Sequence, residues 1–138
     1  MKAADIIREL ELTRATCGYM RQTWNNSHGA ALYFLITPER PGAVHSLNAD
    51  QIYHFYAGAP LEVAFLNPPG QVEHHVLGAF GASANFVPQL LVPAGTVHGS
   101  RTTGDFTLAC TTSFSDSSAR ETEPTVVQRK QMADAGFH

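Results

Sequence analysis

The spacing of hydrophobic and polar residues changes twice along this chain of 138 residues, and the changes divide it into three parts. Near the N-terminus, Ile6, Ile7 and Leu10 recur at the three-to-four-residue spacing of a helix. Asp5 falls in the first turn, where a carboxylate favours the positive end of the helix dipole. This pattern predicts a short amphipathic helix over about residues 3–12.

The middle of the chain consists of short apolar runs separated by turn residues. The runs expected to form strands are residues 30–36, 51–56, 61–66, 72–77, 86–92 and 106–112. Strands this short, spaced about ten residues apart, are typical of an antiparallel sandwich or barrel. The pattern therefore predicts an all-β barrel over about residues 18–114.

The C-terminal part differs again. A stretch rich in Ser, Asp and Thr predicts a loop over about residues 115–123. Pro124 is suited to open a short helix, which would end near Gly136. Because the chain has no internal repeat and no composition shift that marks a boundary, residues 1–138 are expected to form one domain.

Composition excludes several classes of partner. Hydrophobic residues make up 43% of the chain and charged residues 15%, which is typical of a globular protein. The net charge is −3 and the nine basic residues are scattered, so neither nucleic acid nor a membrane is expected as a partner. Acidic Asp5, Glu9 and Glu11 make the N-terminus unlike a targeting peptide, which predicts a cytoplasmic protein. Cys17 and Cys110 lack metal-like spacing and are expected to be reduced thiols.

Two histidines are the strongest chemical signal. His45 lies in the segment 41–51 and His98 ends the segment 93–98, Pro-Ala-Gly-Thr-Val-His. Each segment is expected to carry its histidine into a small barrel. Two imidazoles that meet there would suit either proton transfer or a metal ion.

The same segments resemble a known superfamily. The residues from His45 to Gly58 have the spacing of the first cupin motif, and residues 93–98 resemble the second. Residues 49–62, Ala-Asp-Gln-Ile-Tyr-His-Phe-Tyr-Ala-Gly-Ala-Pro-Leu-Glu, closely resemble the signature of small single-domain cupins of unknown function. The resemblance implies a double-stranded β-helix, also called a cupin or jelly-roll barrel, with short terminal helices. It also implies a homodimer.

The departures from the cupin pattern concern its metal ligands. Leu47 stands in place of the second histidine and Gln51 in place of the glutamate. His45, Gln51 and His98 remain in register with the ligands of the family. Two imidazoles and one amide carbonyl could hold Zn, Ni, Cu or Fe, but weakly, because no ligand charge offsets that of the metal. The alternative is a metal-free pocket in which the two imidazoles face each other.

Strand alternation outlines the wall of this pocket. With Gln51 pointing inward, Tyr53 and Phe55 point inward as well, and Leu47 follows His45. Arg101 is expected at the barrel mouth, where it could meet one anionic group. The residues expected to bind the substrate are Leu47, Gln51, Phe55, Phe65, Arg101 and Cys110. A fully packed barrel core would show the same apolar pattern.

The chemistry of this pocket favours a small-molecule isomerase, epimerase or cyclase. His45 or His98 would take a proton from a carbon acid, and the other histidine or Tyr53 would return one. The substrate is expected to be an uncharged or singly anionic, partly apolar metabolite, because few basic residues are placed to hold phosphates. Two alternatives remain: a metal-dependent cupin oxygenase or lyase, and a barrel that binds a small ligand without catalysis.

Overall fold

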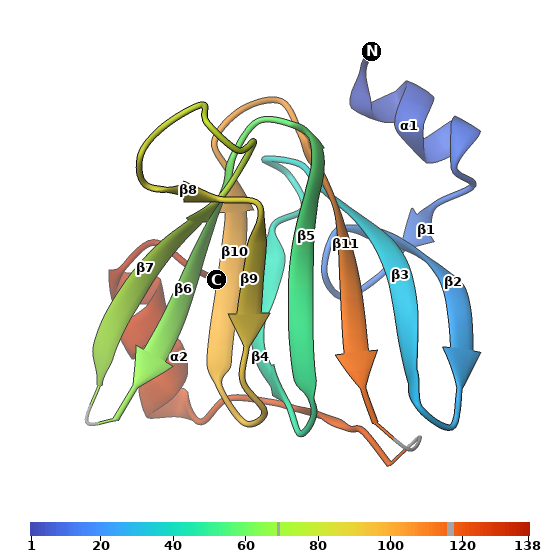
Figure 1. Cartoon of the computed structure of the whole chain (residues 1–138). Helices are drawn as coiled ribbons and strands as arrows, with labels where there is room; N and C mark the ends of the chain where they lie inside the picture. The colour runs from blue at the N-terminus through green and yellow to red at the C-terminus, as the bar shows by residue number, and fades with distance from the viewer. Residues whose placement is uncertain (69, 116–117) are drawn as a thin grey trace.

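The computed structural model describes every residue except 69 and 116–117, and these residues form two facing six-stranded sheets with a helix near each end of the chain (Figure 1). The first sheet has the order β1 (Thr13–Arg14), β2 (Tyr19–Asn26), β3 (Gly29–Ile36), β11 (Thr107–Phe114), β5 (Asp50–Gly58) and β9 (Gln89–Val92). The second has the order β12 (Glu121–Thr122), β4 (Gly42–Leu47), β10 (Val97–Thr102), β6 (Leu61–Asn67), β7 (Gln71–Leu77) and β8 (Phe86–Val87). The predicted all-β class is confirmed.

Helix α1 is shorter than predicted. It spans Ala3–Glu9 instead of residues 3–12. The chain cannot continue as a helix because Glu11 takes a φ of 54°, in the left-handed region. Ile6 and Leu12 nevertheless pack together against the outer face of the first sheet, so the segment still buries the apolar residues that predicted it.

Helix α2 begins later than predicted. It spans Val126–Asp134, and Thr125 caps it rather than Pro124 opening it. The Thr125 hydroxyl accepts a hydrogen bond from the Gln128 backbone, and the Gln128 side chain accepts one from the Thr125 backbone. This reciprocal pair satisfies two N–H groups that the first helical turn leaves open. The helix ends before Gly136, as predicted.

Two differences concern strands. The predicted strand over residues 86–92 is divided at Pro88, which has no N–H to donate to a ladder. The predicted loop over 115–123 contains β12, which pairs with the end of β4. Residues 116–117 of this predicted loop lie outside the described residues. No local pattern of residues predicted β12, because its two residues pair only with β4, which is distant in the chain. Its pairing brings a charged segment beside His45.

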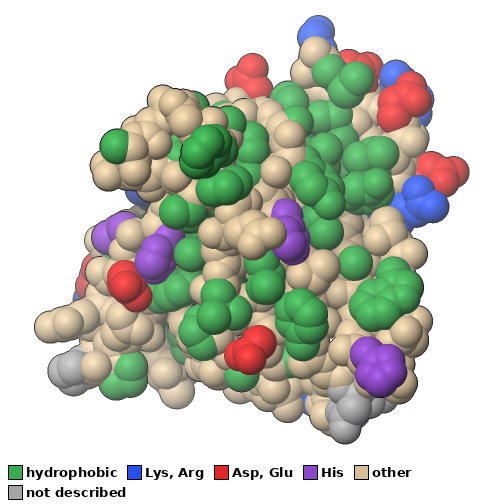
Figure 2. All heavy atoms as spheres, in the orientation of Figure 1, with side chains coloured by type: hydrophobic (Ala, Val, Ile, Leu, Met, Phe, Trp, Pro, Cys, Tyr) green, Lys and Arg blue, Asp and Glu red, His purple; other side chains and the backbone are tan. Residues whose placement is uncertain are grey.

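The hydrophobic residues lie in three layers. One cluster fills the space between the sheets and contains Leu61, Val63 and Leu77. A second lies under α2, which covers the outer face of the second sheet, and a third lies under α1. The outer face of the first sheet is the least covered, and Figure 2 shows its hydrophobic side chains. Its exposed large residues are Trp24, Tyr56, Leu91 and Phe114. The homodimer implied by the family resemblance stays a prediction.

No helix among the described residues has the length and hydrophobicity needed to cross a bilayer.

Candidate functional site

The two histidines meet on neighbouring strands of the second sheet. His45 on β4 and His98 on β10 are direct partners in an antiparallel ladder, so their side chains leave the same face of the sheet. Their ring centroids are 4.8 Å apart. Both face the interior, where His45 is 9% exposed and His98 is 2% exposed. Strand pairing thus joins two segments that are distant in the sequence.

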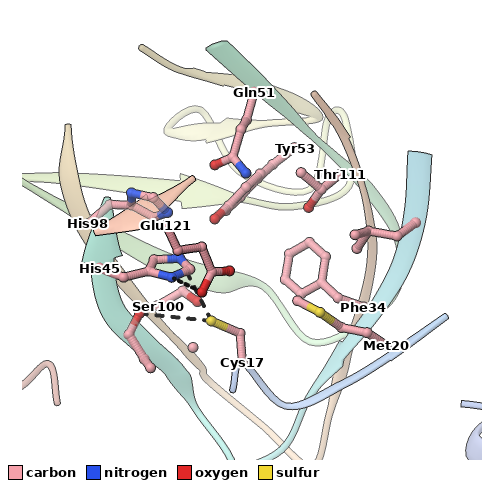
Figure 3. Close-up of a pocket in the computed structure, with 13 residues that line it drawn as sticks. Cys17, Met20, Phe34, His45, Gln51, Tyr53, His98, Ser100, Thr111 and Glu121 are labelled. Carbon is pink, nitrogen blue, oxygen red and sulfur yellow. Dashed lines mark hydrogen bonds and ion pairs between the residues drawn. The ribbon is translucent and has the colours of Figure 1, made fainter. Parts of the chain in front are cut away.

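The histidines line a hollow of about 90 Å³ between the sheets (Figure 3). Gln51 and Tyr53 of β5 form part of its opposite wall, as alternation along that strand predicted. A larger hollow of about 330 Å³ adjoins it and shares four lining residues with it. The shared residues are Leu32, Gln51, Thr111 and Glu121. The two hollows thus form a small inner chamber and a wider outer one.

His98 presents a lone pair to the inner chamber. Its Nδ1–H donates to the Thr96 carbonyl at 2.9 Å, which leaves Nε2 unprotonated. This buried Nε2 and the Oε1 of Gln51 have no hydrogen-bond partner among the described residues. Burial is the main cause that lowers the pKa of His98 to about 4, and the nearby His45 adds to the shift. His98 is therefore neutral near pH 7 and can accept a hydrogen bond.

His45 has two partners that the sequence did not indicate. Its Nε2 lies 3.8 Å from the Sγ of Cys17, and its Nδ1 lies 3.7 Å from the Oε2 of Glu121. Figure 3 shows the thiol and the carboxylate close to the imidazole. Cys17 lies in the loop before β2 and was expected only as a reduced thiol. Glu121 lies in β12, which the sequence pattern did not predict.

The loop that carries Cys17 is held in place by two features. Gly18 has a φ of 61°, and a Cβ at this position would lie 2.2 Å from the Leu35 carbonyl oxygen, so only glycine fits. The Arg40 guanidinium donates to the carbonyls of Ala15 (2.7 Å) and Gly18 (3.3 Å). These contacts fix the loop over β3, and they direct the Cys17 side chain into the inner chamber.

Two further side chains of the chamber stay protonated. Burial raises the pKa of Cys17 to about 11, against a smaller opposite effect of a hydrogen bond with the Ala43 backbone. Burial also raises the pKa of Tyr53 far above its usual value, and the nearby Cys17 and Glu121 add to it. The Tyr53 hydroxyl can therefore donate a hydrogen bond to a bound oxygen, but it is a poor source of a free proton.

Some predicted substrate-binding residues lie elsewhere in the interior. Leu47 lines the outer hollow and not the inner one. Phe65 belongs to the packed cluster between the sheets, where its ring lies against His75 with centroids 4.6 Å apart. Phe55 points inward with Gln51 and Tyr53, as alternation predicted, but it packs against the same cluster and lines neither hollow.

Arg101 and Cys110 were expected to bind the substrate, but they line neither hollow. Arg101 points away from the interior, where its Nε donates to Glu62 at 2.6 Å and its guanidinium covers the Phe137 ring. Alternation on β11 directs Thr111 into the hollows, so Cys110 faces the other side of the sheet. There its thiol interacts with Tyr56, and that contact contributes to a raised pKa of Tyr56.

The residues present do not fit a resident metal of the cupin type. Within the described part of the chain, no three His, Cys, Asp or Glu side chains are arranged to hold a metal ion. Leu47 lies in the position of a nitrogen ligand, and Gln51 offers a neutral oxygen where the family has a carboxylate. His45 also has Cys17 and Glu121 as neighbours at its two nitrogens. The chemistry of this chamber is therefore that of its own side chains.

Residues 4–115 match the model of a family described as Cupin superfamily (DUF985). The chain belongs to this family, and its fold is the cupin double-stranded β-helix. No curated protein matches the sequence.

Several solved structures share this fold. A protein from Shewanella oneidensis is 28% identical, with a TM-score of 0.78 over 84% of this chain and 79% of that one. A hypothetical protein from Leishmania major is 22% identical, with a TM-score of 0.74 over 83% and 81%. The DMSP lyase DddQ from Ruegeria pomeroyi is 18% identical, with a TM-score of 0.58 over 74% and 49%. A cupin-type function, binding or transforming a small molecule, follows from the family.

Proposed function

We propose that this cupin is a small-molecule isomerase or epimerase that works by acid–base catalysis, with His45 as the residue that moves the proton. The observation that carries the proposal is that His45 lines the inner chamber with the Oε2 of Glu121 3.7 Å from its Nδ1. A carboxylate beside one nitrogen of an imidazole stabilises the charged form that appears when the other nitrogen takes a proton.

The two histidines have different roles in this proposal. The lowered pKa of His98 makes it a weak base, but its free Nε2 can accept a hydrogen bond from a substrate hydroxyl. His45 has the carboxylate neighbour and is the residue proposed to take the proton. Tyr53, with its raised pKa, is suited to donate a hydrogen bond to the oxyanion that develops when a carbon acid loses its proton.

The two hollows favour an uncharged substrate. None of the described residues that line them is Lys or Arg, and Glu121 contributes a negative charge. The inner chamber presents apolar side chains such as Met20 and Phe34 beside its polar groups. The outer hollow presents amides, among them Asn25 and Asn26. A substrate with a small, partly apolar reacting end and a polar, neutral remainder matches both.

The test is hydrogen exchange at carbon. The protein is incubated in D2O with a panel of neutral hydroxy-ketones and aldehydes, and deuterium incorporation is measured by mass spectrometry. We expect one or more compounds to exchange, and His45→Gln and His98→Gln to reduce the rate by about 100-fold or more. His28→Gln, an exposed site outside both hollows, is the matched control.

Three outcomes would count against this proposal. Exchange that proceeds unchanged in both histidine variants would exclude the acid–base proposal. Stoichiometric metal in protein purified without chelator, together with turnover that requires it, would establish the metal-dependent oxygenase or lyase instead. A compound that raises the melting temperature and is recovered without any exchange would indicate a binding protein.

A further inference from the structure

We propose that Cys17 is a nucleophile that forms a covalent adduct with small, neutral α,β-unsaturated carbonyl compounds, with His45 as its base and Glu121 as the residue that orients His45. This site lies beyond the acid–base function proposed above and does not depend on it. It uses the thiol that neither the family motifs nor the predicted pocket included.

The geometry is that of a thiol–imidazole–carboxylate series. The Cys17 Sγ lies 3.8 Å from His45 Nε2, within reach of an S–H hydrogen bond. The Oε2 of Glu121 lies 3.7 Å from His45 Nδ1, an ion-pair distance that is too long for a hydrogen bond. A nucleophile, a base and a group that orients the base define an activated nucleophile. Each member comes from a different part of the fold: the loop before β2, strand β4 and strand β12.

The thiol needs this base. Burial holds Cys17 in its protonated form near pH 7, with a pKa raised to about 11. Only the thiolate attacks carbon, so the rate of reaction depends on a group that removes the proton as the bond forms. The alternative acceptor within reach, the Ala43 carbonyl at 3.9 Å, cannot act as a base.

A second feature indicates that a ligand belongs beside this thiol. The Nε2 of His98, a residue that is 2% exposed, lines the same chamber without a hydrogen-bond partner among the described residues. Gln51 Oε1 is also buried without a hydrogen-bond partner among the described residues. Buried polar atoms without partners are costly, and a bound molecule with a hydroxyl or an N–H group would satisfy them.

The size and chemistry of the chamber favour conjugate addition over acyl transfer. A space of about 90 Å³ holds a few heavy atoms, and addition to an alkene releases no leaving group that must escape. Tyr53, which stays protonated and lies near Cys17, can donate a hydrogen bond to the carbonyl oxygen. A soft sulfur nucleophile and a soft β-carbon are matched in reactivity.

The step balances without another reagent. The Cys17 S–H proton passes to His45 Nε2, and the sulfur forms a bond to the β-carbon. The electron pair of the carbon–carbon double bond moves to the α-carbon and the carbonyl oxygen, where Tyr53 stabilises the enolate. The proton on His45 then passes to the α-carbon. The net change is addition of S–H across the double bond, and His45 returns to its neutral form.

The experiment uses acrylamide, a small neutral α,β-unsaturated amide, on the folded protein, with adducts located by peptide mass spectrometry. Cys110 is an internal control, because it is as buried as Cys17 (8% and 7% exposed) and is also a free thiol. It lies on the other side of the sheet, away from His45. We expect Cys17 to react at least about tenfold faster than Cys110.

Variants separate an activated thiol from one that is only accessible. His45→Gln should slow the Cys17 reaction by about tenfold or more and leave Cys110 unchanged, and Glu121→Gln should slow it by a smaller factor. Melting curves and circular dichroism test whether each variant is folded. If His45→Gln does not fold, the effect of Glu121→Gln on the Cys17 rate decides the proposal. Equal rates at the two cysteines, or a Cys17 rate that neither variant alters, would overturn the proposal. Since no turnover is measured, failure here is independent of the hydrogen-exchange test.

Discussion

The interior of this barrel has two halves that differ in what the inward positions carry. In the packed half, β6 and β7 direct Leu61, Val63 and Leu77 inward, and each is fully buried. In the hollow half, β4, β10 and the loop before β2 direct His45, His98 and Cys17 inward around an open chamber. The same strand alternation produces both halves.

This contrast shows that the fold provides the interior and that the inward side chains determine whether it is filled. Aliphatic side chains have no polar atoms to satisfy, so they pack closely. His98 and Gln51 have buried polar atoms without described partners, and the space beside them is where a ligand would satisfy those atoms. Stability should therefore concentrate in the packed half, and chemistry in the hollow half.

The largest expected contrast comes from the same substitution in each half. Leu61→Ala removes a fully buried side chain from the packed cluster and should cost about 3–5 kcal/mol of unfolding free energy. Leu32→Ala removes a partly buried side chain that already borders both hollows, so it should cost only about 1 kcal/mol. Urea denaturation measures both. Equal losses would show that the hollow is filled or collapsed in solution.

The next contrast concerns pH and His98. Its folded pKa is about 4, below the ordinary value of 6.5, so between these values the unfolded chain binds a proton that the folded chain does not. Stability should therefore be complete above about pH 6.5 and fall by about 3 kcal/mol as the pH drops to about 4. Denaturation of His98→Gln at each pH should show a flatter profile, whereas His28→Gln should match the native protein. A profile unchanged by His98→Gln would place the titration on other groups.

The smallest expected effect on stability belongs to Glu121. Its side chain is 58% exposed and lies 3.7 Å from His45, so Glu121→Gln should change the unfolding free energy by less than about 0.5 kcal/mol. The role proposed for Glu121 is to orient His45, and its effect should appear in the rate of Cys17 alkylation. A large loss of stability would mean that Glu121 serves mainly to hold β12 on the barrel.

The residue pattern was enough to predict the class of fold, the short helices at the two ends, and the strand that carries Gln51 and Tyr53. It could do so because alternation and turn residues are local signals. The family motifs added the register of the two histidines.

The other groups that join the two histidines became visible only in the folded chain. Cys17 reaches the chamber through a glycine turn held by Arg40, and Glu121 reaches it through the pairing of β12 with β4. Tertiary packing also placed Arg101 against Glu62 and Phe137, away from the pocket expected for it. Contacts of this kind depend on loops and edge strands whose partners are distant in the chain, and no local pattern of residues encodes such a pairing.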